Sequence, residues 1–212
     1  VPIVSDKNPF IDGILTGGLK RAEIAAAYRG DHELTWGSLL GDQAELPVHT
    51  YTRSDRSGAA ESWASYLGIP PMQLAGIAVT GDEQMIRSVV NDSLAIGYCN
   101  AHFAYDFLIR DVKEGLQIIP LDFNENGQID PREKMYDSLC CMQRSVYLGT
   151  FPTHLCREMA LVTIGIPENP AIVALLNWIY DEGQTVAKEH GYPQLRHYII
   201  RESLIMLEKQ GI

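Results

Sequence analysis

The stretch 47–68 has the pattern of a strand that changes abruptly into a helix. Residues 47–52 are rich in β-branched and aromatic side chains, whereas residues 59–67 are good helix formers with a regularly spaced apolar face. Ser57 stands at the N-cap position of this helix, and Gly68 follows its last residue. A strand–turn–helix unit of this kind constrains the chain to a fold in which strands and helices alternate.

The turn between this strand and this helix has the chemistry of an anion site. The free N–H groups of residues 58–60 and the positive end of the helix dipole favour negative charge, and the Ser57 hydroxyl can add a donor. Arg53, at the strand end, carries the planar fork that suits a tetrahedral oxyanion. Asp55 can hold Arg53 in place, and it can accept the proton that phosphate, unlike sulfate, carries at neutral pH. The alternative is an ordinary capped helix with a surface Arg53–Asp55 pair.

Strand and helix patterns also alternate along the rest of the chain. Apolar runs predict strands at 1–4, 94–99, 116–121 and 159–164, the last beside the first. Helical spacing predicts helices over 19–29, 82–91 and 134–146, from Asn169-Pro170 onward, and through Ile200, Leu204 and Leu207 to Gly211. Trp36 is expected in a loop. We expect a single α/β domain over residues 1–212, with a mixed, largely parallel sheet flanked by helices.

The charge of the chain excludes some partners. A formal net charge of −10 over 212 residues argues against nucleic acid or an acidic membrane surface. An anion site in this chain must therefore be built locally, from dipoles and a few side chains. No apolar run approaches membrane-spanning length.

The cysteines do not identify a compartment. Their positions have no metal-ligand spacing: Cys99, Cys140, Cys141 and Cys156. One of the adjacent pair could form a disulfide with Cys156, or these residues could remain buried free thiols.

The motif Arg53-x-Asp55-x-Ser57-Gly58, followed by a helix, occurs with three other stretches in a fixed order. These are a helix, glycine and tryptophan block at 24–36, the strand Leu94-Ala95-Ile96-Gly97-Tyr98, and Gly183-Gln184 with Gly191-Tyr192 and Leu195. From about residue 1 to residue 195 their order and spacing resemble the periplasmic phosphate-binding proteins that feed phosphate ABC transporters.

This resemblance implies a type II solute-binding fold in which phosphate is held between two lobes. Arg53, Ser57 and Gly58 match ligand-contacting positions of the family, and Asp55 matches the acid beside the arginine. Ala59 stands where the family usually has Thr or Ser, so only its backbone N–H would serve as a donor. The resemblance also implies a non-catalytic protein that delivers phosphate, or a similar oxyanion, to the permease of an ABC transporter.

The same resemblance sets expectations for location and completeness. It implies a periplasmic or extracytoplasmic protein, with a lipid anchor as one option in a full-length precursor. The family's first-lobe anion loop, upstream of the strand matched by residues 1–4, has no counterpart in this chain. We therefore expect a fragment that by itself binds phosphate poorly, and whose apolar surface near the C-terminal helices could be exposed or buried in a dimer.

A second motif fits the twelve-residue calcium loop of EF-hands. Oxygen-bearing side chains stand at loop positions 1, 3, 5 and 9, glycine at 6 and glutamate at 12, and position 7 offers its carbonyl. The expected calcium ligands are Asp122, Asn124, Asn126, Gln128, Asp130 and Glu133. The flanking patterns place this EF-hand-like loop between a strand and a helix, so we expect structural calcium. The alternative is a polar turn that binds no metal.

The sequence leaves two alternatives to oxyanion transport. A calcium-stabilised structural or sensing domain, derived from a binding-protein lobe, would need no anion site. A hydrolase would need Ser57 as nucleophile and His49 as its base, but the chain lacks the Gly-x-Ser-x-Gly elbow typical of such enzymes. We therefore expect no enzymatic activity.

Overall fold

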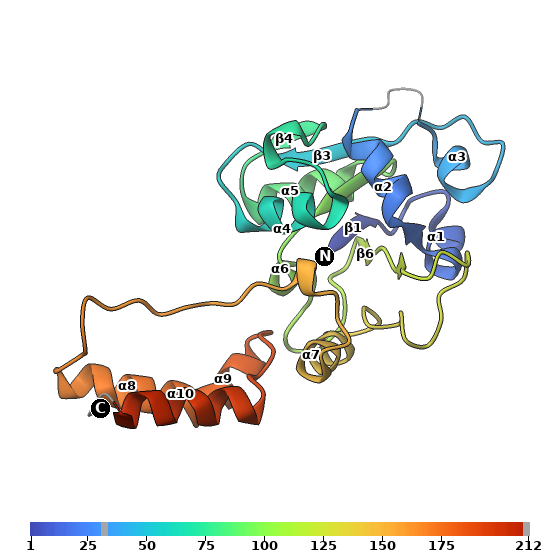
Figure 1. Cartoon of the computed structure of the whole chain (residues 1–212). Helices are drawn as coiled ribbons and strands as arrows, with labels where there is room; N and C mark the ends of the chain where they lie inside the picture. The colour runs from blue at the N-terminus through green and yellow to red at the C-terminus, as the bar shows by residue number, and fades with distance from the viewer. Residues whose placement is uncertain (31–33, 210–212) are drawn as a thin grey trace.

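A five-stranded mixed sheet forms the centre of the structure, a computed structural model that describes residues 1–30 and 34–209 (Figure 1). The strand order is β4-β3-β5-β1-β6. The strands are β1 (Pro2–Ser5), β3 (His49–Arg53), β4 (Ile77–Val79), β5 (Ala95–Tyr98) and β6 (Leu116–Ile118). β3 pairs in parallel with β4 and β5, and β1 runs antiparallel to β5 and β6. Of these five strands only β1 opposes the common direction.

The remaining elements connect and cover this sheet. Two short strands pair in parallel: β2 (Leu19–Lys20) and β7 (Leu121–Asp122). The α-helices are α1 (Ile11–Gly17), α2 (Arg21–Tyr28), α3 (Trp36–Leu40), α4 (Gly58–Leu67), α5 (Gly81–Asn91), α6 (Ala101–Ala104), α7 (Leu139–Leu148), α8 (Pro170–Tyr180), α9 (Gly183–Glu189) and α10 (His197–Lys209). Two 3₁₀ turns are η1 (Pro71–Gln73) and η2 (Thr153–Leu155).

Helices cover both faces of the sheet, as two consecutive residues of β5 illustrate. A Cβ added at Gly97 would lie 2.6 Å from Val89 of α5. The ring of the next residue, Tyr98, lies 5.9 Å from that of Tyr28 in α2 and 5.7 Å from that of Trp63 in α4. Because consecutive strand residues point to opposite faces, α5 covers one face and α2 with α4 the other. The predicted α/β class, with a largely parallel sheet flanked by helices, is confirmed.

Tyr98 also fixes the end of β3 from inside the core. Its hydroxyl accepts a hydrogen bond from the backbone N–H of Arg53 at 3.1 Å and lies 3.0 Å from the Thr52 hydroxyl. The aromatic ring is buried between α2 and α4. The position of Arg53 is therefore set by the packed core as well as by the strand pairing.

The prediction of a strand at 159–164 is wrong. Residues 157–163 form neither helix nor strand, and they extend from η2 toward the C-terminal helices (Figure 1). Both edges of β1 are already paired, with β5 and with β6, so this segment finds no free edge there. Its apolar side chains stay in solvent, and Val162 is 90% exposed.

Several predicted boundaries also shift. The helix expected at 134–146 begins only at Leu139, because Ser138 provides its N-cap by accepting from the N–H of Cys141. The helix expected at 19–29 begins at Arg21, because the two preceding residues pair with β7. Trp36 opens the short helix α3 rather than lying in a loop. The predicted helix end at Gly211 lies outside the described residues.

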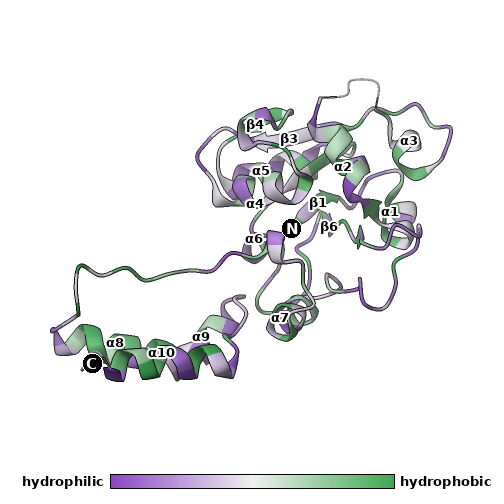
Figure 2. Ribbon diagram, viewed as in Figure 1, coloured by the Kyte–Doolittle hydropathy of each residue, from purple (hydrophilic) through white to green (hydrophobic). Residues whose placement is uncertain are grey.

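Helices α8, α9 and α10 form a C-terminal group that contacts α7 through the end of α9 and the start of α10, where the His197 ring lies 6.5 Å from that of Tyr147. The Gln143 side chain of α7 donates to the carbonyls of Lys188 and Tyr192, at 2.8 and 3.0 Å. Figure 2 shows hydrophobic residues along α8 and α10. None of the described helices is long and apolar enough to cross a membrane. The single domain over 1–212 stays a prediction.

Candidate functional site

The turn between β3 and α4 has the predicted capping geometry. Ser57 is the N-cap of α4, and its Oγ accepts a hydrogen bond from the N–H of Ala59 at 3.2 Å. Gly68 ends the helix in the left-handed conformation with a φ of 70°. In the described part of the chain, the N–H groups of Gly58 and Ala60 donate to no other residue. The start of α4 therefore offers two free N–H groups beside the Ser57 hydroxyl.

Arg53 is held at this turn by Asp55. Its Nε donates to Asp55 Oδ1 at 2.8 Å and its Nη2 to Oδ2 at 2.6 Å, a bidentate pair. The Arg53 side chain is only 6% exposed. Its guanidinium holds the pKa of the Asp55 carboxyl well below the usual range, and the same hydrogen bonds raise the pKa of Arg53.

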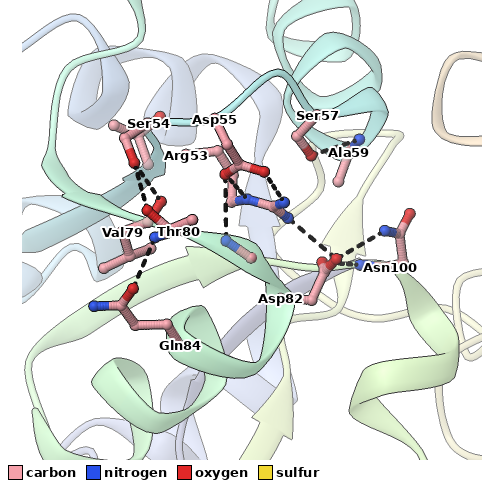
Figure 3. A network of polar contacts seen from close by, with 12 residues as sticks. Arg53, Ser54, Asp55, Ser57, Ala59, Val79, Thr80, Asp82, Gln84 and Asn100 are labelled. Atoms are coloured by element: carbon pink, nitrogen blue, oxygen red, sulfur yellow. Dashed lines mark hydrogen bonds and ion pairs between the residues drawn. The ribbon is translucent and has the colours of Figure 1, made fainter.

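Asp82, at the start of α5, is a site residue that the sequence analysis missed (Figure 3). It is 7% exposed, and its Oδ2 lies 3.1 Å from Arg53 Nη1. Asn100 donates to both its oxygens, through its backbone N–H at 2.9 Å and its Nδ2 at 3.0 Å. Arg53 Nη1 lies at ion-pair distance from this carboxylate but makes no hydrogen bond of good geometry. The contact of Nη1 with Asp82 is therefore an ion pair rather than a well-aligned hydrogen bond.

These contacts discriminate between the two roles expected for Asp55. Both its oxygens accept from Arg53, and Oδ1 also accepts from the N–H of Gly81 at 3.2 Å. A carboxylate with occupied oxygens and a lowered pKa is a weak proton acceptor. The geometry therefore favours an orienting role for Asp55, which also ties the end of β3 to the start of α5.

The predicted calcium ligands lie in one loop, but their oxygens are bonded within it. Asp122 and Glu133 are buried, at 2% and 4% exposure. Asp122 accepts from the N–H groups of Asn126 and Gly127, at 3.2 and 2.8 Å, and Glu133 accepts from that of Phe123 at 2.8 Å. Among the described residues no group of three or more acidic, His or Cys side chains is arranged to hold a metal. Calcium binding thus stays a prediction.

The remaining predicted ligands surround these two buried carboxylates. Asp130 Oδ2 accepts from the side-chain amides of Asn124 and Asn126, at 2.7 and 3.2 Å. Gln128, expected to offer its carbonyl, is exposed. A strand does precede the loop, since β7 ends at its first residue, but turns rather than a helix follow directly after Glu133.

The Ser57–His49 pair considered for a hydrolase is not formed. His49, at the start of β3, has its Nδ1 2.8 Å from Asp92 Oδ2. Ser57 follows the opposite end of that strand, where its Oγ caps α4. The four cysteines are free thiols, so the disulfide considered with Cys156 is also absent.

A cavity of about 540 Å³ lies apart from this turn, among α7 and the C-terminal helices. It is lined by Tyr147, Asn177, Tyr180, Asp181, Gln184, Thr185, Gln194, Leu195, His197, Ile200 and Leu204. None of the predicted site residues lines it.

The sequence matches no protein-family model. No curated protein is significantly similar to it. Among solved structures, the fold is similar to that of an ABC-type phosphate transport receptor from Vibrio cholerae, with a TM-score of 0.59 and 16% identity over 90% of this chain and 67% of that one.

Two further solved structures share the fold. PstS from Borrelia burgdorferi has a TM-score of 0.52 and 17% identity, over 92% of this chain and 68% of that one. A high-affinity periplasmic phosphate-binding protein, PfluDING, has a TM-score of 0.61 and 11% identity, over 95% of this chain and 67% of that one. At these identities the likeness establishes the fold that the sequence patterns indicated.

Proposed function

We propose that this chain is the extracytoplasmic solute-binding component of an ABC importer, and that it binds phosphate or a similar tetrahedral oxyanion at the turn between β3 and α4. One observation carries the proposal. Arg53, nearly buried and fixed by Asp55, lies beside the start of α4 in a fold shared with phosphate-binding proteins. An arginine oriented in this way is prepared to bind an anion without further ordering.

The donors at the turn suit four oxygens in a tetrahedral arrangement. Ser57 can donate its hydroxyl hydrogen, because its oxygen already accepts from Ala59. The N–H groups of Gly58 and Ala60 and the dipole of α4 favour negative charge at the helix start. The Arg53 guanidinium supplies the positive charge. The N–H of Ala59, expected to contact the ligand, donates instead to Ser57 Oγ, so in this proposal Ala59 caps the helix while its neighbours contact the ligand.

The partner and location follow from the same proposal. A solute-binding component delivers its ligand to a transporter permease, and it acts outside the cytoplasm. PfluDING, which shares the fold, is a periplasmic protein. The proposal also includes a lipid anchor in a precursor and a dimer in solution. Exposed apolar side chains on α8 and α10 favour the dimer, because they could be buried against a second copy.

The test is calorimetric titration of phosphate into the chain, extended to millimolar ligand, with sulfate as a second anion. Phosphate should bind the wild type, and Arg53→Lys should weaken binding because an ammonium lacks the planar fork. Arg56→Ala is the matched control, because Arg56 lies in the same turn but is exposed. Absence of phosphate binding to the wild type would overturn the proposal, as would unchanged affinity in Arg53→Lys.

Calcium binding by the loop 122–133 is a second candidate. Asp122 and Glu133 are both buried, yet among the described residues neither forms an ion pair with a basic side chain. Buried carboxylates are normally compensated by a cation or a metal. Gly127, at the tight turn of the loop, has the φ of 77° that glycine allows. Calcium in this loop would stabilise the domain and would not replace the oxyanion site.

A further inference from the structure

Arg157 reaches the start of α4 from a distant part of the chain. It follows η2, at the beginning of the segment that leads to the C-terminal helices. Its guanidinium lies directly against Gly58: a Cβ added there would clash with Nη1 and Cζ and lie 3.2 Å from Nη2. A side chain at the first position of α4 would displace the Arg157 guanidinium from this contact.

The Arg157 guanidinium is connected to that of Arg53 through two side chains. Arg157 Nη2 donates to Asn100 Oδ1 at 2.9 Å. Asn100 in turn donates to both oxygens of Asp82, the carboxylate 3.1 Å from Arg53 Nη1. Figure 3 shows Asn100, Asp82 and Arg53 in this order below the start of α4. Asn100 and Asp82 therefore link the two arginines near the start of α4.

The positive charge of Arg157 lies at an electrostatically unfavourable place. A cation beside a helix N-terminus is electrostatically unfavourable, because the dipole is positive there. In the described part of the chain Arg157 forms no ion pair with a carboxylate. Independently, the buried Nη1 of Arg53 makes no hydrogen bond of good geometry. An anion between the two guanidinium groups would satisfy both.

We propose that Arg157 is a second arginine of the oxyanion site, one that pairs with the bound anion at the start of α4. The proposal rests on the oxyanion-binding function and adds a residue to it. Arg53 is already paired with Asp55 and Asp82, whereas Arg157 has no carboxylate partner in the described part of the chain, so Arg157 is the guanidinium whose charge a bound oxyanion would balance. Asn100 is the positioning residue, because its amide aims Arg157 at the start of α4.

Calorimetry of the whole chain with phosphate as the probe tests this role. Arg157→Ala should weaken phosphate binding about 10- to 100-fold, since it removes charge-assisted hydrogen bonds. Arg157→Lys should lose less, because it keeps the charge, and the exposed Arg56→Ala should have little effect. All three should melt at the wild-type temperature, because both arginines are exposed.

A double-mutant cycle separates direct contact from a general charge effect. Gly58→Ala should weaken binding in the wild type, because its Cβ displaces the Arg157 guanidinium, but much less in the Arg157→Ala background. If the wild type binds phosphate and Arg157→Ala binds it equally well, the role of Arg157 is refuted while the oxyanion site stands. If the wild type binds no phosphate, both proposals fall.

Discussion

Arg53 and Asp82 meet in a nearly buried ion pair, with 3.1 Å between Nη1 and Oδ2. Arg53 ends β3, and Asp82 lies in the first turn of α5, directly after β4. β3 and β4 are parallel neighbours in the sheet, so their carboxyl ends meet at one edge. The pair therefore depends on the sheet topology, and it places a charged group of α5 beside the proposed oxyanion site.

Breaking this pair should destabilise the fold as well as the site. Arg53→Ala leaves the buried Asp82 carboxylate without its cation, which typically costs about 3 kcal/mol. We expect urea unfolding to report a loss of this size. In the Arg53→Ala background, Asp82→Asn should recover part of the loss, because the amide carries no charge. If the double variant is no more stable than Arg53→Ala, the pair contributes little to folding.

The lowered pKa of Asp55 predicts how the stability of the fold changes at acidic pH. This pKa is lowered by Arg53, so the contribution of Asp55 is present above the unfolded pKa of about 4 and is lost as the pH falls toward the folded value. Wild-type stability should therefore decrease below about pH 4, and Asp55→Asn should decrease less steeply over the same range. Thermal unfolding from neutral to acidic pH provides the measurement; parallel curves for the two proteins would contradict it.

The same variant tests how Asp55 acts on the ligand. If Asp55 only orients Arg53, Asp55→Asn should weaken phosphate and sulfate binding by a similar factor. A variant that instead gained affinity for sulfate relative to phosphate would show that Asp55 accepts the proton of phosphate, against the orienting role. Parallel titrations with the two anions distinguish these outcomes.

The local part of the site could be predicted from the sequence, whereas its long-range part could not. Ser57 and Gly68 are helix-boundary signals readable over a few residues, and the cap and the C-terminus of α4 lie where these residues indicated. Asp82 carries no such signal, because an acid in a first helical turn ordinarily only complements the dipole. Its contact with Arg53 requires knowledge that β4 pairs with β3.

At 159–164, by contrast, the sequence predicts a strand that the fold does not form. The apolar and β-branched residues of this segment have strand propensity, but propensity does not say whether a free strand edge lies within reach. Because β5 and β6 occupy both sides of β1, the expected pairing partner is taken. Arg157, directly before this segment, was likewise unpredictable, because only the folded chain brings it to Gly58.

Gly97 should tolerate no side chain. A Cβ there would lie 2.6 Å from Val89 Cγ2 and 2.9 Å from Met85 Sδ, both on α5. Gly97→Ala should therefore destabilise the fold by about 1 to 3 kcal/mol, through overpacking. Gly13→Ala in α1 is the matched control: its nearest neighbour would be 3.7 Å away, and alanine favours helix. Urea unfolding checks both; equal stability of the two variants would exclude tight packing between β5 and α5.

Calcium should stabilise the protein if the loop 122–133 binds it. An ion that binds only the folded state raises the unfolding free energy by about 2.7 kcal/mol at a concentration 100 times its Kd, or roughly 5 to 10 °C for a chain of this size. Addition of calcium to chelator-treated protein should give a shift of this order. Magnesium should give less, because it demands octahedral geometry and keeps its waters.

Glu133 provides the control for this shift. Glu133→Gln should abolish the calcium response, because it removes the charge and the bidentate ligand of the loop. It should leave the metal-free protein folded, since an amide oxygen can still accept from the N–H of Phe123. A calcium-induced rise that persists in Glu133→Gln would place the ion elsewhere. Equal melting temperatures of the wild type with and without calcium would contradict calcium binding. The loop would then be held by its own hydrogen bonds alone.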